Sequence, residues 1–273
     1  MKGGDFVNNR VGIDAGGSLI KIAYEENGIL HYRKQPISEM DEALGWLKLI
    51  SSNKSIFLTG GRAGKIKAKL FPESEIVDEF SSACEGANYL MRKEGLPAAE
   101  NSLLINIGTG TSWFKIEGEE YNRVLGSGIG GGTFMGMGRL LADSSDFANL
   151  VHMSASGQRG NVDLLVKDLY HPEEPPIPGD LTASNFAKTE AINASSRADK
   201  MASFMNLIAE TITLLTVQTA ALHGIKNVIF IGSTLAGNKP LQDSLAYYCK
   251  MSGLEPIFLQ NGEFSGAIGA MLR

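Results

Sequence analysis

Residues 10–34 of this 273-residue chain read RVGIDAGGSLIKIAYEENGILHYRK, and this stretch decides the fold. Three short runs rich in apolar and β-branched residues, at 10–14, 18–25 and 29–34, are separated by a Gly-Gly turn and an Asn-Gly turn. An Asn-Gly pair between two such runs is a strong signal for a β-hairpin. The segment therefore predicts an antiparallel meander of three strands.

The residues that follow alternate between helical and strand patterns. The predicted elements are, in chain order, a helix near 39–51, a strand at 55–59, a helix near 62–70, a strand at 75–78 and a helix at 81–94. We expect Ser81 and Ser82 to cap the last of these helices. The predicted order is βββαβαβα, which defines an α/β fold.

The same pattern begins again after residue 100, which indicates an internal duplication. Strands are predicted at 102–107, 111–117 and 121–125, with a glycine turn at 108–110 between the first two. Two copies of one supersecondary unit that face each other create a cleft with a glycine turn on each wall. A nucleotide fits such a cleft.

Aligning the two copies fixes the expected correspondence of their residues. Asp14 aligns with Asn106 at an offset of 92 residues, and Lys21 aligns with Lys115 at an offset of 94. The sequence therefore predicts that two extra residues lengthen the second turn.

The domain organisation follows from the repeat, with one half at 1–100 and the other at 101–273. The second half contains an insertion at about 143–200. Its other predicted elements are a helix at 133–142, a helix at 201–223, a strand at 227–231, a helix at 239–252, a strand at 256–259 and a helix at 264–272. The apolar stretch 201–222 contains Glu210, Asn206 and Gln218, so it predicts a buried helix rather than a membrane span.

Composition narrows the class of partner. The chain carries 25 Lys and Arg against 30 Asp and Glu, for a net charge of −5, which offers no basic field for nucleic acid. Its two cysteines, Cys84 and Cys249, form no metal-ligand cluster. The first nine residues, MKGGDFVNN, lack the apolar core of a signal peptide. We expect a cytoplasmic protein that binds small molecules, and neither nucleic acid nor a membrane.

The first glycine turn, DAGGSLIK at 14–21, has the groups that Mg-ATP requires. Adjacent backbone amides in a tight turn form an anion-binding nest. Asp14 can hold Mg²⁺ through its water ligands, and Lys21 can neutralise phosphate charge. The structural alternative is a simple hairpin with an exposed lysine, but the repeat of the turn favours the functional interpretation.

Two further glycine segments could contact phosphate. The second turn places the hydroxyls of Thr109, Thr111 and Ser112 on the opposite wall, where they could hold phosphate or substrate, although such residues also favour turns by themselves. The segment 126–138, GSGIGGGTFMGMG, leads into a helix, and a glycine-rich helix N-terminus binds anions. This segment matches neither a Walker A nor a Rossmann motif.

Three other positions are candidates for chemistry. Glu79 follows a predicted strand and could act as a general base, although acidic residues also favour the first turn of helices, and Asp78 and Glu85 compete with it. Arg123 could bind a carboxylate or could simply be exposed on its strand. The turn that includes Ser233 could contact the adenine or ribose.

Several ordered motifs resemble the type II pantothenate kinases across nearly the whole chain. These motifs are DAGGSLIK, TGGRAG, VDEFSSACEG, NIGTGTS, GIGGGTF, PPIPGDLTASNF, VIFIGS and NGEFSGAIGA. The resemblance implies an actin-like, ribonuclease H-like fold of two duplicated domains with a nucleotide cleft between them. It also implies a homodimer that phosphorylates pantothenate to 4′-phosphopantothenate with ATP and Mg²⁺, the first step of coenzyme A biosynthesis.

The resemblance assigns roles to individual residues. Glu79 would be the catalytic base, and Ser112 and Arg123 would hold pantothenate, with the arginine facing its carboxylate. The residues implied to bind ATP are Asp14, Ala15, Gly16, Gly17, Ser18, Leu19, Ile20, Lys21, Thr109, Gly131, Gly132, Thr133, Phe134, Met135, Phe147 and Ser233. Two positions depart from the family, since Ser18 stands where threonine is common and Phe147 where a tyrosine can occur.

Two other functions remain open from the sequence. An actin-like kinase for a sugar or amino sugar would have similar nucleotide-binding motifs, because a fold does not decide its substrate. A non-catalytic, ATP-driven switch protein would also use the same cleft. The placement of Glu79 and Arg123 suits a substrate with a carboxylate better than a neutral sugar.

Overall fold

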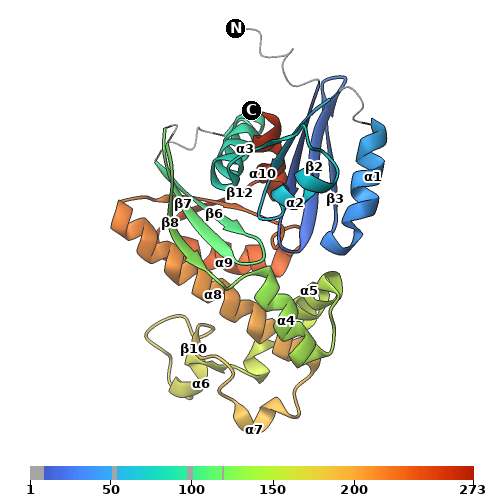
Figure 1. Ribbon diagram of the computed structural model, residues 1–273. Coiled ribbons are helices and arrows are strands. Elements are labelled where there is room, and N and C mark those ends of the chain that lie inside the picture. The colour runs from blue at the N-terminus through green and yellow to red at the C-terminus, as the bar shows by residue number, and fades with distance from the viewer. Residues whose placement is uncertain (1–8, 51–53, 97–100, 119) are drawn as a thin grey trace.

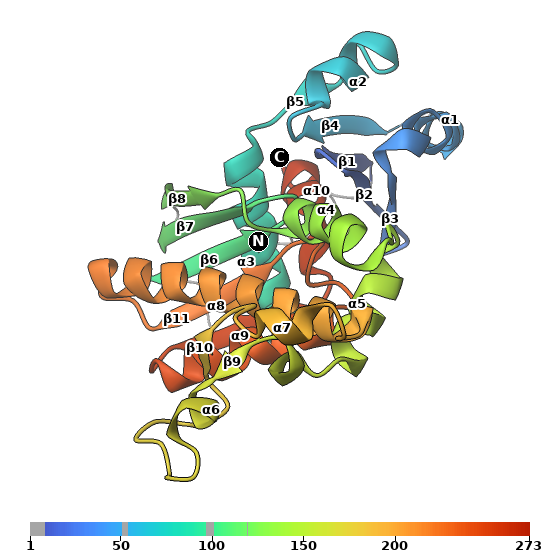
Figure 2. The same cartoon turned by 90° about the horizontal axis from the view of Figure 1, so that it is seen from below.

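The computed structural model describes residues 9–50, 54–96, 101–118 and 120–273. Two five-stranded sheets face each other across a pair of helices, and a long helix runs along the outer face of the second sheet (Figure 1). Seen from below, α4 lies where the two sheets approach each other, and the insertion projects away from the first sheet (Figure 2).

The two sheets have the same strand order. The first consists of β1 (Arg10–Ala15), β2 (Leu19–Glu26), β3 (Ile29–Pro36), β4 (Ser55–Thr59) and β5 (Glu75–Ile76), in the order β3-β2-β1-β4-β5. The second consists of β6 (Ser102–Ile107), β7 (Thr111–Glu117), β8 (Glu120–Ser127), β11 (Asn227–Ile231) and β12 (Glu255–Phe258), in the order β8-β7-β6-β11-β12. In each sheet an antiparallel meander is followed by two parallel strands, which confirms the predicted duplicated α/β fold.

The strand register corrects the predicted alignment of the two turns. Asp14 pairs with Lys21 across β1 and β2, whereas Asn106 pairs with Ser112 across β6 and β7. The second turn is therefore one residue shorter than the first, and the prediction of two extra residues is wrong. Lys115 has a similar sequence context to Lys21, but the register places it beyond the turn, where it pairs with Glu117 at 2.6 Å.

Helices cover both outer faces of the sheets. The first sheet carries η1 (Ile37–Glu39), α1 (Met40–Ile50) and α2 (Ala63–Lys69), and the second carries α4 (Gly131–Ala142), α5 (Phe147–Ser156), α8 (Arg197–His223) and α9 (Lys239–Met251). Each set packs on buried apolar residues of its sheet, such as Ile13 and Leu58 in the first half and Ile105 and Phe230 in the second. The two outer cores are thus separate.

Two helices form the layer between the sheets. These are α3 (Glu79–Lys93) and α10 (Ser265–Met271), which follows η3 (Gly262–Phe264). A Cβ atom at Gly86 would lie 1.9 Å from the Ser265 carbonyl oxygen, and one at Gly269 would lie 1.8 Å from that of Ser82. The helices therefore cross in backbone contact. Because α3 packs on the second sheet and α10 returns to β1, each half contributes a helix to the other.

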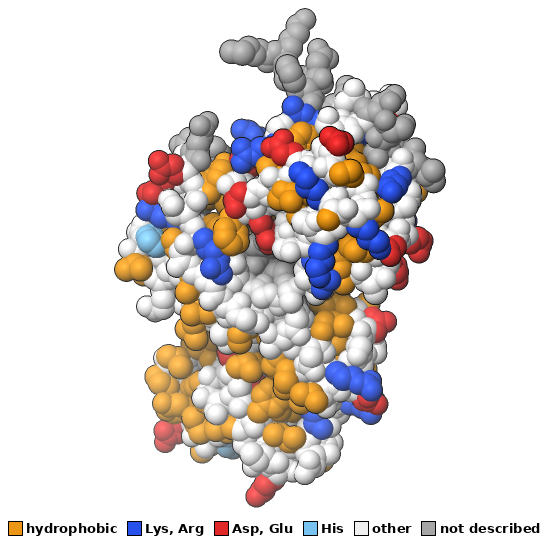
Figure 3. Space-filling view, in the orientation of Figure 1, with side chains coloured by type: hydrophobic (Ala, Val, Ile, Leu, Met, Phe, Trp, Pro, Cys, Tyr) orange, Lys and Arg blue, Asp and Glu red, His pale blue; other side chains and the backbone are white. Residues whose placement is uncertain are grey.

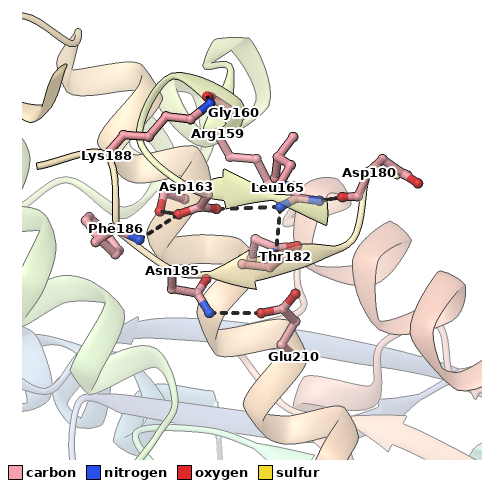
Figure 4. A network of polar contacts seen from close by, with 12 residues as sticks. Arg159, Gly160, Asp163, Leu165, Asp180, Thr182, Asn185, Phe186, Lys188 and Glu210 are labelled. Carbon is pink, nitrogen blue, oxygen red and sulfur yellow. Dashed lines mark hydrogen bonds and ion pairs between the residues drawn. The ribbon is translucent and has the colours of Figure 1, made fainter. Parts of the chain in front are cut away.

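The insertion adds short elements beside α8. They are η2 (Arg159–Asn161), β9 (Leu164–Leu165), α6 (Val166–Tyr170), β10 (Thr182–Ser184) and α7 (Thr189–Ile192). A polar network joins them to α8 (Figure 4). Arg159 donates to the Thr182 hydroxyl at 2.8 Å and lies 3.5 Å from the fully buried carboxylate of Asp163, while Asn185 donates to Glu210 of α8 at 3.1 Å.

Helix α8 is the one described helix that is long and apolar enough to cross a membrane by length and composition. Half of its most apolar 18-residue window is buried against the rest of the chain. The helix begins at Arg197, four residues before the predicted start, because Ser196 and Asp199 form a capping box. Its packing against the second sheet confirms the predicted core helix.

Candidate active site

The ion pair of Asp14 and Lys21 lies where the first meander turns. The two residues are directly paired on β1 and β2, and the lysine Nζ lies 2.8 Å from a carboxylate oxygen of Asp14. Both side chains are largely buried, at 14% exposure for the lysine and 12% for the aspartate. An ion pair with this little solvent is held in one geometry, so the sheet orients both charges.

A glycine supports the end of the central strand in each half. Gly60 (φ +89°) follows β4, and a Cβ atom there would lie 2.6 Å from the Ala15 carbonyl oxygen. Gly232 (φ +114°) follows β11, and a Cβ atom there would lie 2.4 Å from the Ile107 carbonyl oxygen. Both positions require glycine for the same two reasons. The φ angle is unfavourable for L residues, and the carbonyl oxygen at the strand end leaves no room for a Cβ atom.

The two turns meet at the centre of the molecule. The Ser18 hydroxyl lies 3.2 Å from the hydroxyl of Thr109, and a Cβ atom at Gly17 would lie 3.3 Å from the same Thr109 oxygen. The structure thus brings the predicted residues of both turns together. Ala15 and Ile20 have fully buried side chains, so these two positions could contact a nucleotide only through their backbone.

Glu79 is the first residue of α3 and faces the ion pair. Asp78 provides the N-cap by accepting a hydrogen bond from the Ser81 amide at 2.8 Å, so the predicted cap at Ser81 and Ser82 is wrong. Asp78 was missed because the sequence contains two serines that could also cap. A helix that starts two residues early carries Glu79 in its first turn, next to the positive end of the dipole.

A small cavity of about 20 Å³ connects the charged side chains. Its polar lining consists of Asp14, Lys21, Glu79, Asn106, Glu263 and Ser265. Burial raises the pKa of the Glu79 carboxyl, and the neighbouring Asp14 raises it further, although the residue as a whole is exposed. A carboxylate with a raised pKa beside a lysine is a candidate general base.

The two competing acidic residues have other partners. The Ser81 amide lowers the pKa of Asp78, which serves as the helix cap. Glu85 lies six residues after Glu79 on α3 and pairs with Arg273 at 3.4 Å. Of these three carboxylates, Glu79 is the one that lines the cavity with Asp14 and Lys21.

Arg123 is aimed toward Ser112 by a β-bulge. The β7–β8 pairing shifts by one residue between Trp113 and Phe114, so Arg123 and Gly126 fall on the same face of β8. The guanidinium Nε donates to the Ser112 hydroxyl at 3.4 Å. A Cβ atom at Gly126 would lie 1.9 Å from the guanidinium, so the glycine provides the space that Arg123 fills.

Phe80 connects Arg123 to the base candidate. The Arg123 guanidinium carbon lies 5.5 Å from the centroid of the Phe80 ring, and Phe80 directly follows Glu79. Phe80 is 42% exposed. Sequence reasoning missed this residue, and its position beside Glu79 was the available signal. Phe80 therefore lies between the carboxylate and the guanidinium that the sequence predicts to contact the substrate.

The glycine-rich segment that leads into α4 is hydrogen-bonded to the second turn. The amides of Gly131 and Gly132 donate to the carbonyls of Gly108 and Thr109, at 2.8 and 2.9 Å. The Thr133 hydroxyl donates to the Gly128 carbonyl at 2.7 Å. These bonds use two backbone amides of this helix start within the chain. They dock α4 on the second turn, which places the predicted residues next to Thr109.

The remaining predicted residues line the second half. Phe134 is fully buried, so its ring cannot face a ligand, and Phe147 packs edge-on against it at 5.8 Å between centroids. Met135 also packs on this core. Ser233 is half-buried in the turn after β11. Gly232, next to it, lines a cavity of about 510 Å³ at the ends of β11 and β12.

Two charged residues at the rim of this larger cavity were not predicted. Lys34 on β3 pairs with Glu263 at 3.0 Å, and Glu263 also lines the small cavity beside Glu79. Lys34 lies directly across from Lys21 in the strand register. The sequence signal was the position of Glu263 inside the glycine-rich motif that begins α10.

Comparison with known proteins agrees with this geometry. A sequence profile described as Fumble matches residues 25–273. A type II pantothenate kinase of Oceanobacillus iheyensis is 40% identical over 263 residues, which cover 96% of this chain and 98% of the relative.

Solved structures show the same fold at low sequence identity. An activator of 2-hydroxyisocaproyl-CoA dehydratase from Clostridium difficile, with bound ADPNP, aligns with a TM-score of 0.66 at 18% identity, over 96% of this chain and 92% of that chain. A ROK family glucokinase from Streptomyces griseus, in complex with glucose and AMPPNP, aligns with a TM-score of 0.54 at 13% identity, over 96% and 97% of the two chains.

The duplicated fold places the chain in the structural class of actin-like folds, as predicted. Within that class, the identity and coverage of the sequence matches are decisive. The chain belongs to the type II pantothenate kinase family.

Proposed function

We propose that this chain transfers the γ-phosphoryl group of ATP to the terminal hydroxyl of pantothenate. The observation that carries the proposal is the spatial order of the charged and polar side chains along one side of the cleft. Asp14, Lys21 and Glu79 share one small cavity, and Phe80 connects this cavity to Arg123 and Ser112. The order fits a substrate with a hydroxyl at one end and a carboxylate at the other.

At the nucleotide end, the two glycine turns would hold the phosphates. The backbone of 14–21, the Thr109 hydroxyl and the start of α4 surround the point where the halves meet, and Ser233 and Phe147 lie on the side of the second half. The cavity of about 510 Å³ beside Gly232 has room for an adenosine.

The donors near Asp14 suit Mg²⁺ that keeps its water ligands. Magnesium in kinases is held by one or two carboxylates together with substrate phosphates. The part of the chain that the structure describes has no group of three acidic, histidine or cysteine side chains that could bind a metal without a nucleotide. Bound there with ATP, Mg²⁺ would neutralise charge on the β- and γ-phosphates.

At the substrate end, Arg123 and Ser112 would bind the pantothenate carboxylate. A guanidinium binds a carboxylate through charge-assisted hydrogen bonds with defined geometry. Arg123 has no carboxylate partner within 4 Å among the described residues, so its charge is available to a ligand. The Phe80 ring and Gly126 fix the guanidinium from two sides.

Glu79 would accept the proton of the attacking hydroxyl. Phosphoryl transfer depends on alignment and on neutralisation of charge, with a base to orient the nucleophile. Lys21, held by Asp14, would face the transferred phosphoryl group. The raised pKa of Glu79 makes it a better proton acceptor than an ordinary glutamate.

The exposed face of α8 supports the proposed homodimer. Leu214 is 64% exposed and Leu222 is 81% exposed, and Thr211 and Gln218 lie on the same helical face. Glu210 is the one charged residue between 207 and 222. An uncharged face on a long helix suits a two-fold contact with the same helix of a second copy.

The cysteines argue against a switch protein that binds a metal cluster. Burial raises the pKa of Cys84 to about 12 and that of Cys249 to about 11. Metal clusters require thiolates, which such pKa values disfavour. Against a sugar kinase stands Arg123, because a neutral sugar would leave this cation without a partner.

One assay tests the proposed function. ADP release is measured with Mg-ATP and, separately, pantothenate, pantetheine, glucose or N-acetylglucosamine. We expect turnover with pantothenate. Turnover only with a sugar would show that the chain is a sugar kinase of the same fold. ATP hydrolysis without any acceptor would favour the switch protein.

A further inference from the structure

We propose that Arg62 is a further catalytic residue, whose guanidinium contacts the transferred phosphoryl group of ATP. Arg62 precedes α2 and lies directly after the glycine pair that follows β4. Its guanidinium Nη2 donates to the carbonyl of Gly17 in the first turn at 3.3 Å. This inference rests on the proposed phosphoryl transfer and adds a residue to it.

The backbone fixes Arg62 against the phosphate turn. Its amide donates to the Ala15 carbonyl at 3.1 Å, and Gly60, two residues earlier, packs on the same strand end. The Gly17 carbonyl that its side chain binds belongs to the part of the turn that touches Thr109. The guanidinium is therefore held at the junction of the two halves, where the phosphates are proposed to lie.

The duplicated position in the second half shows that closing the turn does not require an arginine. The amide of Thr234 donates to the Ile107 carbonyl at 3.1 Å, which repeats the bond of Arg62 to Ala15. The Thr234 side chain then donates to the Gly108 carbonyl at 2.8 Å. A neutral hydroxyl thus closes the second turn, whereas the first half uses a cation in the same place.

The net charge of the small cavity gives a reason for a cation at Arg62. Lys21 is paired with Asp14 and Lys34 with Glu263, and Glu79 adds a further negative charge. Together these side chains leave an excess of negative charge where a triphosphate must bind. Phosphoryl transfer builds charge on the equatorial oxygens, and an arginine is the group that commonly stabilises it.

Arg62 is available for this role. Among the described residues it has no carboxylate within 4 Å, and its bond to Gly17 uses one of five N–H donors. Basic side chains lie on both flanks of the hollow between the two halves (Figure 3). A planar guanidinium can keep its turn contact and still present a second pair of donors to phosphate oxygens.

The test compares Arg62→Thr, which copies the residue of the second half, with Arg62→Lys and with Lys65→Gln as a control. Lys65 is an exposed cation on α2 that does not contact the turn. We expect Arg62→Thr to lower kcat by roughly 10²–10³-fold with a change in the KM for ATP below about threefold. Lys65→Gln should match the unmodified chain, and Arg62→Lys should fall between.

Added guanidinium ion separates catalysis from folding. Millimolar guanidinium, far below denaturing levels, should restore part of the kcat of Arg62→Thr while leaving Lys65→Gln unchanged, with the melting temperature of each variant recorded alongside. The inference is overturned if Arg62→Thr keeps kcat within threefold, or if its loss follows a lowered melting temperature and guanidinium gives no rescue. An unmodified chain that is inactive with pantothenate would instead contradict the proposed function.

Discussion

The two halves of this kinase share a strand order but differ in charge at three matched positions of the cleft, those of Asp14, Lys21 and Arg62. Asp14 and Lys21 form an ion pair in the first half, where the second half has Asn106 opposite Ser112. Gly60 and Gly232 repeat the same close contact with a strand end. The glycines that shape the cleft thus occur in both halves, whereas the charges proposed to act on phosphate lie in one half.

The difference suggests a division of labour between the halves. The first half supplies the ion pair, Glu79 and Arg62, all of which face the proposed phosphoryl group. The second half supplies Ser112 and Arg123, which face the proposed carboxylate. Variants in the first half should therefore change turnover, and variants in the second should change substrate binding.

The largest effect should come from Glu79→Gln. Removal of a positioned base should lower kcat by roughly 10²–10⁴-fold and leave ATP binding intact. Steady-state kinetics with pantothenate, together with calorimetric titration of ATP, measure both quantities. Glu85→Gln is the matched control on the same helix, and a comparable loss in that variant would contradict the role given to Glu79.

Converting the first turn to the composition of the second tests the comparison itself. In Asp14→Asn, Lys21 loses its partner and the Mg²⁺ waters lose their carboxylate, so kcat should fall by roughly 10²-fold. The reciprocal variant, Asn106→Asp, adds a carboxylate without a lysine partner to the same small cavity, so it should raise the KM for ATP and lower kcat by less than Asp14→Asn does. Equal losses in the two variants would show that the halves share the chemistry.

Arg123→Ala should act on binding rather than on turnover. Loss of a charged hydrogen-bonding partner should raise the KM for pantothenate by roughly 10–100-fold, while the KM for ATP stays nearly constant. Arg139→Ala is the control, because Arg139 is an exposed arginine paired with Asp143. A change in the KM for ATP alone would contradict the proposal that Arg123 binds pantothenate.

The shared backbone of the halves predicts matched losses of stability. Gly60→Ala and Gly232→Ala should each lower the free energy of unfolding by about 1–3 kcal/mol, since both combine a positive φ with a close carbonyl. Chemical denaturation measures both values. Gly61→Ala is the control because a Cβ atom there meets nothing within 4 Å. If only one of these two variants lost stability, the two glycines would not be structurally equivalent.

The smallest effect concerns the pH dependence of Glu79. Its raised pKa means that the fold disfavours ionisation, so its contribution to stability is fully present below its ordinary pKa and is lost as pH rises through the raised value. Glu79→Gln should thus melt slightly higher than the unmodified chain near pH 7.5, and the difference should vanish near pH 4. A lower melting temperature at neutral pH would contradict the raised pKa.

Much of the fold was predictable because it is local and repeated. The Asn-Gly hairpin, the glycine turns and the apolar spacing of the helices each depend on a few consecutive residues. The duplication was visible in the match of Asp14 to Asn106. The register of the second turn was not, because the similar context of Lys21 and Lys115 gave a false alignment that only strand pairing corrects.

The parts of the site that escaped prediction depend on distant contacts. The amides of Gly131 and Gly132 are used by a turn more than twenty residues away, and no local pattern reveals such a bond. Phe80 becomes relevant only when the bulge in β8 turns Arg123 toward it. Arg62 was identified by its equivalence to Thr234, and that equivalence is visible only when the backbone hydrogen bonds of the two halves are compared.

The division of labour is tested most directly by calorimetric titration of ATP and of pantothenate into Glu79→Gln and Arg123→Ala. The account predicts that Glu79→Gln binds both ligands as the unmodified chain does, although its kcat is roughly 10²–10⁴-fold lower. It predicts that Arg123→Ala binds ATP normally and loses pantothenate. Loss of ATP binding in Arg123→Ala, or unchanged pantothenate binding there, would contradict the assignment of chemistry to the first half and recognition to the second.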